Sequence, residues 1–196
     1  MTGAGKRGVR SSKDFKGFCG WRKIESVMLD PSLRESTKDL FTTIFLTGGR
    51  ATEVLSLHKD NFNLSNIDRG YIVVERMKVL KHEEDAERTF PIRLSEPISN
   101  RLINLLNHTD GLLFPYSYSW MYKYISTINK YADRNFGEWF PHRLRAERAS
   151  QLLQDYKFGV FELMSFFAWK TSDMPTWYAS LSPDALIKLM MEKGEL

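Results

Sequence analysis

The sequence has 196 residues, of which 42% are hydrophobic, so it fits one ordinary domain with a packed core and is not globally disordered. Its net charge of +4 is mildly basic, which permits an anionic partner without requiring one. The single cysteine, Cys19, excludes an intrachain disulfide, and the lack of a signal peptide or of an apolar run of about 18 residues predicts a cytoplasmic protein without a membrane span, prokaryotic or, if viral, in the host cytoplasm.

The first residues are rich in basic, glycine and serine side chains. Residues 1–17 contain five lysines and arginines but only one acid, Asp14. We therefore expect a flexible basic N-terminal arm or linker over 1–20, followed by one domain over 21–196. Such an arm fits a solvated tail and a segment that follows a nucleic-acid backbone equally well.

Three short helices are predicted in the first third of the chain. Apolar residues recur at helical spacing in the second helix, so this helix should be buried. It should end at Gly48-Gly49, because glycine commonly follows the last turn of a helix. The predicted helices are Trp21–Asp30, Thr37–Leu46 and Ala51–Leu57.

Arg50 lies at the corner between the second and third of these helices. A charged side chain at a tight corner between apolar helices is partly desolvated, so it needs an acid or a bound anion to offset the cost. Glu53, three residues later, is one candidate partner. Taken alone, a structural ion pair with Glu53 is the better interpretation of Arg50.

A β-hairpin is predicted after a turn-rich segment. Tyr71–Val74 is a β-branched run and Arg88–Ile92 a second short strand, with a polar turn at His82–Asp85 between them. Lys78, Lys81 and Arg88 should lie around this hairpin. Without further information, the lysines of an exposed hairpin are expected only to keep it soluble.

The rest of the chain is predicted to be helical, so the fold class is mainly α with a small antiparallel β-sheet (α+β). Ser95 should cap the first of these helices, and serine and proline should start the last one. No internal repeat is present. The predicted helices are Ser95–Asn107, Tyr118–Asp133, Pro141–Tyr156, Phe161–Trp169, Pro175–Tyr178 and a last one from Ser182 to about Lys193.

The segment Pro141-His142-Arg143-Leu144-Arg145 opens one of these helices. Residues three apart share a helix face, so His142 and Arg145 can point into one site. The N-terminus of a helix has unpaired N–H groups and partial positive charge, which makes it a plausible seat for a phosphate. As an isolated motif, a solvated helix face is still the more frequent explanation.

Four separated segments together resemble the catalytic domain of the tyrosine recombinase (phage integrase) family. The first is Leu46–Leu57, in which a glycine corner presents Arg50, and the second is the hairpin that ends in Arg88–Ile92. The third is His142-x-x-Arg145, and the fourth is Trp169 followed nine residues later by Tyr178. The resemblance covers about residues 21–190, and the order and spacing of all four segments are more specific than any one of them.

The resemblance implies transesterification at a DNA phosphodiester. Tyr178 would be the nucleophile, Arg50 and Arg145 would clamp the non-bridging phosphate oxygens, and His142 and Trp169 would add hydrogen bonds. A hairpin lysine would protonate the leaving 5′-oxygen; we favour Lys81 over Lys78 because it lies nearer the turn. No metal and no cofactor are expected. The alternatives for Trp169 and Tyr178 are packing against neighbouring aromatic residues.

This sequence departs from the family pattern at several positions. Gly49 replaces a larger apolar residue, Glu147 and Arg148 replace a histidine and a small residue, and Trp169 replaces the commoner histidine. The N-terminal core-binding domain of the family is expected to be missing.

The resemblance predicts double-stranded DNA as partner and self-association as a tetramer, in which the apolar face around Leu186 could pack within the protomer or on a neighbour. Three functions remain open: a site-specific recombinase, a type IB topoisomerase-like enzyme that relaxes DNA as a monomer, and a non-catalytic DNA-binding regulator. The sequence leaves open the DNA target, and whether Tyr178 attacks within its own protomer.

Overall fold

The structure, a computed structural model, describes residues 18–79, 87–131, 138–179 and 191, with the backbone alone at 131 and 177–179. The fold is mainly helical with a small antiparallel sheet, as predicted. The α-helices are α1 Trp21–Leu29, α2 Glu35–Thr47, α3 Ala51–Leu55, α4 Ser99–Asn107, α5 Tyr118–Ser126, α6 Pro141–Gln154, α7 Val160–Phe167 and α8 Asp173–Ala179. The strands are β1 Phe62–Asn63, β2 Tyr71–Lys78 and β3 Glu87–Arg93, and short 3₁₀ helices lie at Lys59–Asn61, Ile67–Arg69 and Thr127–Tyr131.

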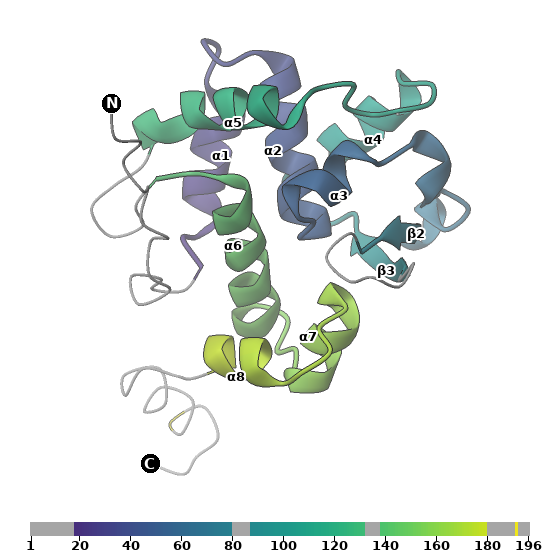
Figure 1. Cartoon of the computed structure of the whole chain (residues 1–196), viewed down its shortest axis with the longest axis vertical. Coiled ribbons are helices and arrows are strands. Elements are labelled where there is room, and N and C mark those ends of the chain that lie inside the picture. The colour runs from purple at the N-terminus through teal and green to yellow at the C-terminus, as the bar shows by residue number, and fades with distance from the viewer. Residues whose placement is uncertain (1–17, 80–86, 132–137, 180–190, 192–196) are drawn as a thin grey trace, which may run out of the picture.

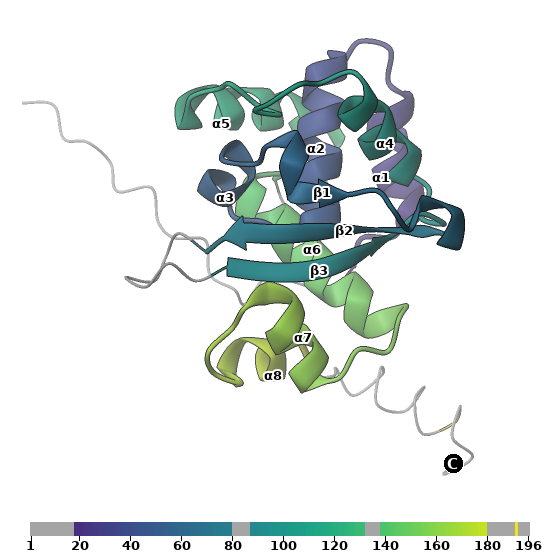
Figure 2. The ribbon, with the colours of Figure 1, turned by 90° about the vertical axis from the view of Figure 1, so that its right-hand side faces the viewer.

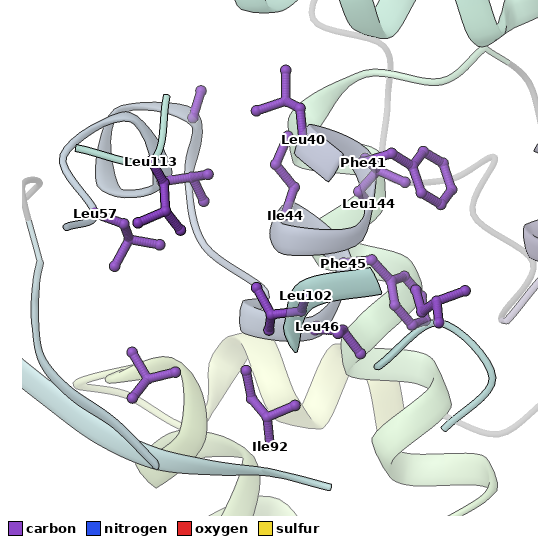
Figure 3. Close-up of a cluster of buried hydrophobic side chains, with 14 of the residues drawn as sticks. Leu40, Phe41, Ile44, Phe45, Leu46, Leu57, Ile92, Leu102, Leu113 and Leu144 are labelled. Carbon is purple, nitrogen blue, oxygen red and sulfur yellow. The ribbon is translucent and has the colours of Figure 1, made fainter. Parts of the chain in front are cut away.

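Helix α2 forms the centre of the core. Its apolar residues, including Leu40, Phe41 and Ile44, are fully buried, and it packs against α4, α5 and α6. Figure 3 shows these side chains on α2 in one cluster with Leu102, Leu113 and Leu144 of neighbouring segments. The apolar residues recur at helical spacing, which is why this segment was predicted to be buried. Buried threonines of the helix, such as Thr43 and Thr47, donate to the carbonyls of Asp39 and Thr43 one turn earlier.

Two groups of helices lie at opposite ends of the molecule. In Figures 1 and 2, α1, α2, α4 and α5 lie at one end, and α7 and α8 lie together at the other, beyond the β2–β3 hairpin. Helix α6 connects the two groups, because it packs against α2 as well as against α7 and α8. The corner between α2 and α3 lies close to the middle of this arrangement.

The sheet has the order β1-β2-β3 and is antiparallel throughout. The short strand β1, in the turn-rich segment before the hairpin, pairs with Val73 and Val74. The β2–β3 register shifts between Val74 and Met77, and Arg76 there has a φ of 51°. This bulge turns Met77 toward the core, opposite Arg88, which faces inward through the regular alternation of β3.

Three predicted helix boundaries are wrong. The helix predicted over Tyr118–Asp133 ends at Ser126, and a 3₁₀ helix follows over Thr127–Tyr131. Ser95 does not cap α4, which begins at Ser99; Pro97 disfavours helical backbone at Glu96, and the Glu96 side chain pairs with α6 instead. The helix predicted to include Trp169 ends at Phe167, because Ala168 takes a left-handed conformation and the Trp169 N–H bonds to the carbonyl of Met164.

Several predictions concern residues outside the described part of the chain. These are the hairpin turn with Lys81, the C-terminal helix after Ser182 with its apolar face, and the arm over 1–17. Of the residues just before α1, Phe18 packs against Trp21 and Phe45, with ring centroids 5.6 and 6.1 Å away.

Candidate active site

Glu53 of α3 is a fully buried carboxylate with three arginine side chains around it. Its Oε1 lies 2.5 Å from Nη1 of Arg50. Its Oε2 lies 3.6 Å from Nη2 of Arg88 and 3.8 Å from Nη1 of Arg145. We call these four residues the Glu53 cluster. Since three guanidinium groups share one carboxylate, positive charge is in excess within it.

Arg50 is the member of the cluster that reaches the surface. It occupies the N-cap of α3 in an extended conformation, and its backbone N–H donates to Oε2 of Glu53 at 2.8 Å. Its side chain is 21% exposed, against 2% for Arg88 and 3% for Arg145. The predicted ion pair with Glu53 is therefore confirmed, and it leaves part of the Arg50 side chain accessible from outside.

Arg145 holds two chain corners together. From α6 it donates to the carbonyl of Gly48 at 2.5 Å and to the carbonyl of Phe167 at 3.2 Å. Its guanidinium also lies over two rings, 4.7 Å from the centroid of Phe167 and 5.6 Å from that of Trp169. The corner after α2 and the end of α7 are thus joined through one side chain whose planar fork suits several acceptors at once.

The glycines at the corner after α2 permit this close packing. Gly48 has a φ of 56°, and a Cβ atom there would overlap the ring of Phe167. A Cβ atom on Gly49 would lie 2.6 Å from both Met77 and Val54. The departure from the family pattern at Gly49 therefore has a steric reason, because a larger side chain would push this corner away from the hairpin.

Arg88 is a member of the cluster that was not among the predicted site residues. Instead of lying on an exposed hairpin, its side chain is buried and donates to the carbonyls of Phe166 at 2.7 Å and Thr47 at 3.0 Å. The alternation of Arg88, Phe90 and Ile92 on the inner face of β3 was the signal that could have revealed its burial.

Burial lowers the pKa of Arg88 to about 10, and the positive charge of Arg50 adds to this shift, while Glu53 opposes it. The guanidinium still carries its charge at neutral pH. The cluster therefore keeps its excess positive charge under physiological conditions, at a desolvation cost that a nearby anion would reduce.

Trp169 lies beside Arg145, just beyond α7. Its ring stacks on Phe167 with centroids 4.5 Å apart and an angle of 18° between the planes, and it remains partly exposed. Packing against a neighbouring aromatic ring, which we considered as an alternative to a catalytic role, does occur. The same ring also faces the guanidinium of Arg145. Trp169 therefore packs against Phe167 and also lies next to the Glu53 cluster.

The remaining predicted site residues are His142, Tyr178 and the two candidate lysines. His142 is exposed in the first turn of α6, one turn before the buried Arg145. Tyr178 lies on α8, which packs against α6 and α7, but its side chain lies outside the described part of the chain. Lys81 also lies outside it, whereas Lys78 is exposed at the end of β2, opposite Glu87.

The cluster is suited to binding an anion rather than a metal ion. Its donors are guanidinium groups, which offer N–H bonds and repel cations. Within the described ranges, no group of three or more His, Cys, Asp or Glu side chains could hold a metal ion.

No helix in those ranges has the length and apolar character needed to cross a bilayer.

Comparison with known proteins identifies the fold. The sequence matches no protein-family model and no curated protein. The structure resembles the XerA recombinase, with a TM-score of 0.67 and 16% identity over 91% of this chain and 65% of the other. It also resembles the XerH site-specific recombinase bound to its difH substrate, with a TM-score of 0.64 and 18% identity over 89% of this chain and 54% of the other.

A third similar structure is the Tn1549 transposon integrase in complex with circular intermediate DNA. Its TM-score is 0.59, at 14% identity over 87% of this chain and 64% of the other. The chain thus spans between about half and two thirds of the length of these solved structures. The arrangement of α1–α8 around the small sheet is the fold of the tyrosine recombinase catalytic domain.

Proposed function

We propose that this chain is the catalytic part of a site-specific DNA recombinase that cleaves and rejoins strands through a 3′-phosphotyrosyl intermediate. The observation that carries the proposal is the convergence of Arg50 and Arg145, 95 positions apart in the sequence, on the single carboxylate of Glu53. An excess of fixed positive charge at a site is what a phosphodiester reaction requires. The DNA complexes among the similar structures support DNA as the partner.

In the proposed reaction the oxygen of Tyr178 attacks the scissile phosphorus. The new bond is a 3′-phosphotyrosyl ester, and the bond from phosphorus to the 5′-oxygen breaks. The tyrosine proton passes to His142 or to a phosphate oxygen, and Lys81 or Lys78 protonates the departing 5′-oxygen. Resealing reverses these steps, so the reaction consumes no ATP.

The arginines would stabilise the negative charge that develops on the phosphate oxygens during this reaction. The pentavalent transition state carries more negative charge on its oxygens than the ground state. Guanidinium groups that are already fixed by Glu53 and by backbone carbonyls do not need to reorganise when that charge develops. The Trp169 indole N–H can donate to the same oxygens but has no proton to exchange at neutral pH.

A nicked suicide duplex tests the proposal, because cleavage near a nick releases a short fragment and traps the covalent complex. Wild-type protein should form an adduct that resists denaturing electrophoresis, and Tyr178→Phe should form none. Tyr71→Phe is the matched control, because Tyr71 begins β2 at the end opposite Met77 and Arg88. This variant should react like wild type.

Two further substrates, a pair of intact duplexes and supercoiled DNA, together with the adduct assay separate the alternative functions. Strand exchange between two duplexes, with protomers that associate as a tetramer on DNA, is the result expected of a recombinase. Relaxation of supercoiled DNA by a monomer without exchange would indicate a topoisomerase-like enzyme. DNA binding without an adduct in wild type and in Tyr178→Phe would indicate a regulator and would overturn the proposed chemistry.

A further inference from the structure

We infer that Arg88 is a positioning residue for strand cleavage: it holds Glu53 and the same two chain corners that Arg145 holds, one next to Arg50 and the other next to Trp169. This inference rests on the proposed function of the same site. Arg88 is about as deeply buried as Arg145, but the residues that it contacts, Thr47 and Phe166 among them, are buried as well, whereas Arg145 lies beside the partly exposed Trp169. We therefore expect no contact between Arg88 and DNA. Its effect must therefore pass through the residues it contacts.

The contacts of Arg88 run parallel to those of Arg145. Arg145 bonds to the carbonyls of Gly48 and Phe167, and Arg88 bonds to those of the preceding residues, Thr47 and Phe166. Two guanidinium groups thus hold the same two corners. One comes from α6 and the other from β3.

The two arginines also share one oxygen of Glu53. Nη2 of Arg88 lies 3.6 Å from Oε2, and Nη1 of Arg145 lies 3.8 Å from it. The same oxygen accepts the backbone N–H of Arg50 at 2.8 Å. Removal of Arg88 would leave Glu53 and both corners held from one side only, so the guanidinium groups that face the phosphate would lose their fixed geometry.

The cost of burying Arg88 indicates that its charge is used. It occupies an inward position of β3, where Phe90 and Ile92 follow, and no hydrogen-bond acceptor lies within reach of its Nε among the described residues. An apolar residue would fill such a position without desolvating a charge. The presence of a guanidinium at this position is explained by its contacts, because it holds two backbone carbonyls and the Glu53 carboxylate beside the proposed reaction site.

The test compares Arg88→Met and Arg88→Lys with wild type in single-turnover cleavage of the suicide duplex at saturating protein. Misplacement of catalytic groups by a supporting residue can cost about 100-fold in rate, and we expect a loss of this order for Arg88→Met. Arg88→Lys should recover part of the rate, because it keeps the charge but not the fork. DNA affinity should change by less than about threefold, because Arg88 does not reach the surface.

A second substrate distinguishes positioning from general destabilisation. In a duplex with a methylphosphonate at the scissile position, a neutral methyl group replaces one charged oxygen, so the reaction depends less on the arginines. The defect of Arg88→Met should shrink at least about tenfold on this duplex. Arg148→Met is the control, since Arg148 is equally buried on α6 but pairs with Glu96.

The outcomes separate the two proposals. If wild type forms no adduct, the proposed function fails and the role of Arg88 falls with it. If wild type cleaves but Arg88→Met and Arg148→Met lose the same factor on both duplexes, only the role of Arg88 is overturned. If neither Arg88 variant folds, as judged by circular dichroism and urea unfolding, Arg88 is a folding residue and the inference is wrong.

Discussion

Helix α6 carries buried charges in two different settings. Arg145 belongs to the Glu53 cluster, where three guanidinium groups share one carboxylate. Arg148, three residues later, meets Glu96 with Nη1 at 2.7 and 2.9 Å from the two carboxylate oxygens. The second setting is balanced, one positive charge against one negative.

The balanced setting is completed by neutral groups. Tyr156 donates to Oε1 of Glu96 at 3.0 Å, and Oε1 of Gln151 accepts from Arg148 at 2.6 Å. We call Glu96, Arg148, Gln151 and Tyr156 the Glu96 cluster. Since both clusters are buried, burial of charge does not by itself mark a functional site. An excess of one sign within a cluster is the better indication, because a bound anion would reduce the cost of burying the like charges.

Replacement of the central carboxylate is expected to have the largest effect and to separate the two settings. Glu53→Gln and Glu96→Gln each leave buried arginines without their counter-charge, so each should lose about 3–5 kcal/mol of unfolding free energy. Added phosphate should restore about 1 kcal/mol to Glu53→Gln, because an anion can replace the lost charge at an accessible site. Urea unfolding in phosphate and in chloride of equal ionic strength measures both effects.

The contrast depends on access to the cluster through Arg50, which is partly exposed. Glu96→Gln should therefore respond to phosphate no more than wild type does. An equal gain in both carboxylate variants would mean that phosphate acts on the whole protein, and the two settings would then not differ in the way we describe.

Replacement of one arginine in each setting should affect different properties. Arg145→Met should slow single-turnover cleavage by about 3–4 kcal/mol of transition-state stabilisation, because it removes fixed donors beside the phosphate. Arg148→Met should mainly lower stability. At a temperature where both variants are folded, its cleavage rate should stay within about threefold of wild type. If Arg148→Met slows cleavage as much as Arg145→Met does, the Glu96 cluster is part of the active site.

The sequence predicted the helices and most of their bounds because apolar periodicity is a local signal. It predicted the pair of Arg50 and Glu53 for the same reason, since residues three apart in a helix are neighbours. It also predicted the corner at Gly48, where the left-handed backbone ends α2. These features depend on short stretches of chain.

The features that the sequence did not reveal depend on distant segments. Helix α6 contains three arginines and one glutamate, so its hydropathy suggests a solvated helix, yet every residue from Arg143 to Leu152 is buried. Its charges are satisfied by partners from other elements, such as Glu53 and Glu96. The burial of Met77 follows from the bulge at Arg76, which shifts the inward-facing positions of β2 and has no clear signature in the sequence.

A smaller effect is expected from the glycine corner beside the Glu53 cluster. Gly49→Ala should cost about 1–3 kcal/mol of stability, because its Cβ would press on Met77 and Val54. It should also slow cleavage beyond the loss of folded protein, since Arg50 is the next residue. The matched control is Gly70→Ala, which has a φ of 82° and open space around the Cβ position. This control should lose roughly 1 kcal/mol through backbone strain alone and cleave at the wild-type rate. Thermal unfolding and single-turnover cleavage of both variants check the expectation, and equal cleavage by the two would contradict it.

The smallest effect concerns another balanced set of charges on α6, where Glu147 pairs with Arg143 and accepts the backbone N–H of Cys19 at 2.7 Å. Burial raises the pKa of the Cys19 thiol far above its usual range, and the negative charge of Glu147 adds to this shift. Because a thiol is reactive only as the thiolate, a raised pKa keeps Cys19 neutral and unreactive to higher pH.

Alkylation at pH 9 should therefore be at least about tenfold slower in the folded protein than in the same protein unfolded in urea. Glu147→Gln removes the second cause and leaves the first, so it should raise the rate by only about two- to threefold. An alkylation rate in the folded wild type equal to that in urea would mean that Cys19 is not held against Glu147 of α6. The set of Arg143, Glu147 and Cys19 would then not be a closed, balanced set that contrasts with the Glu53 cluster.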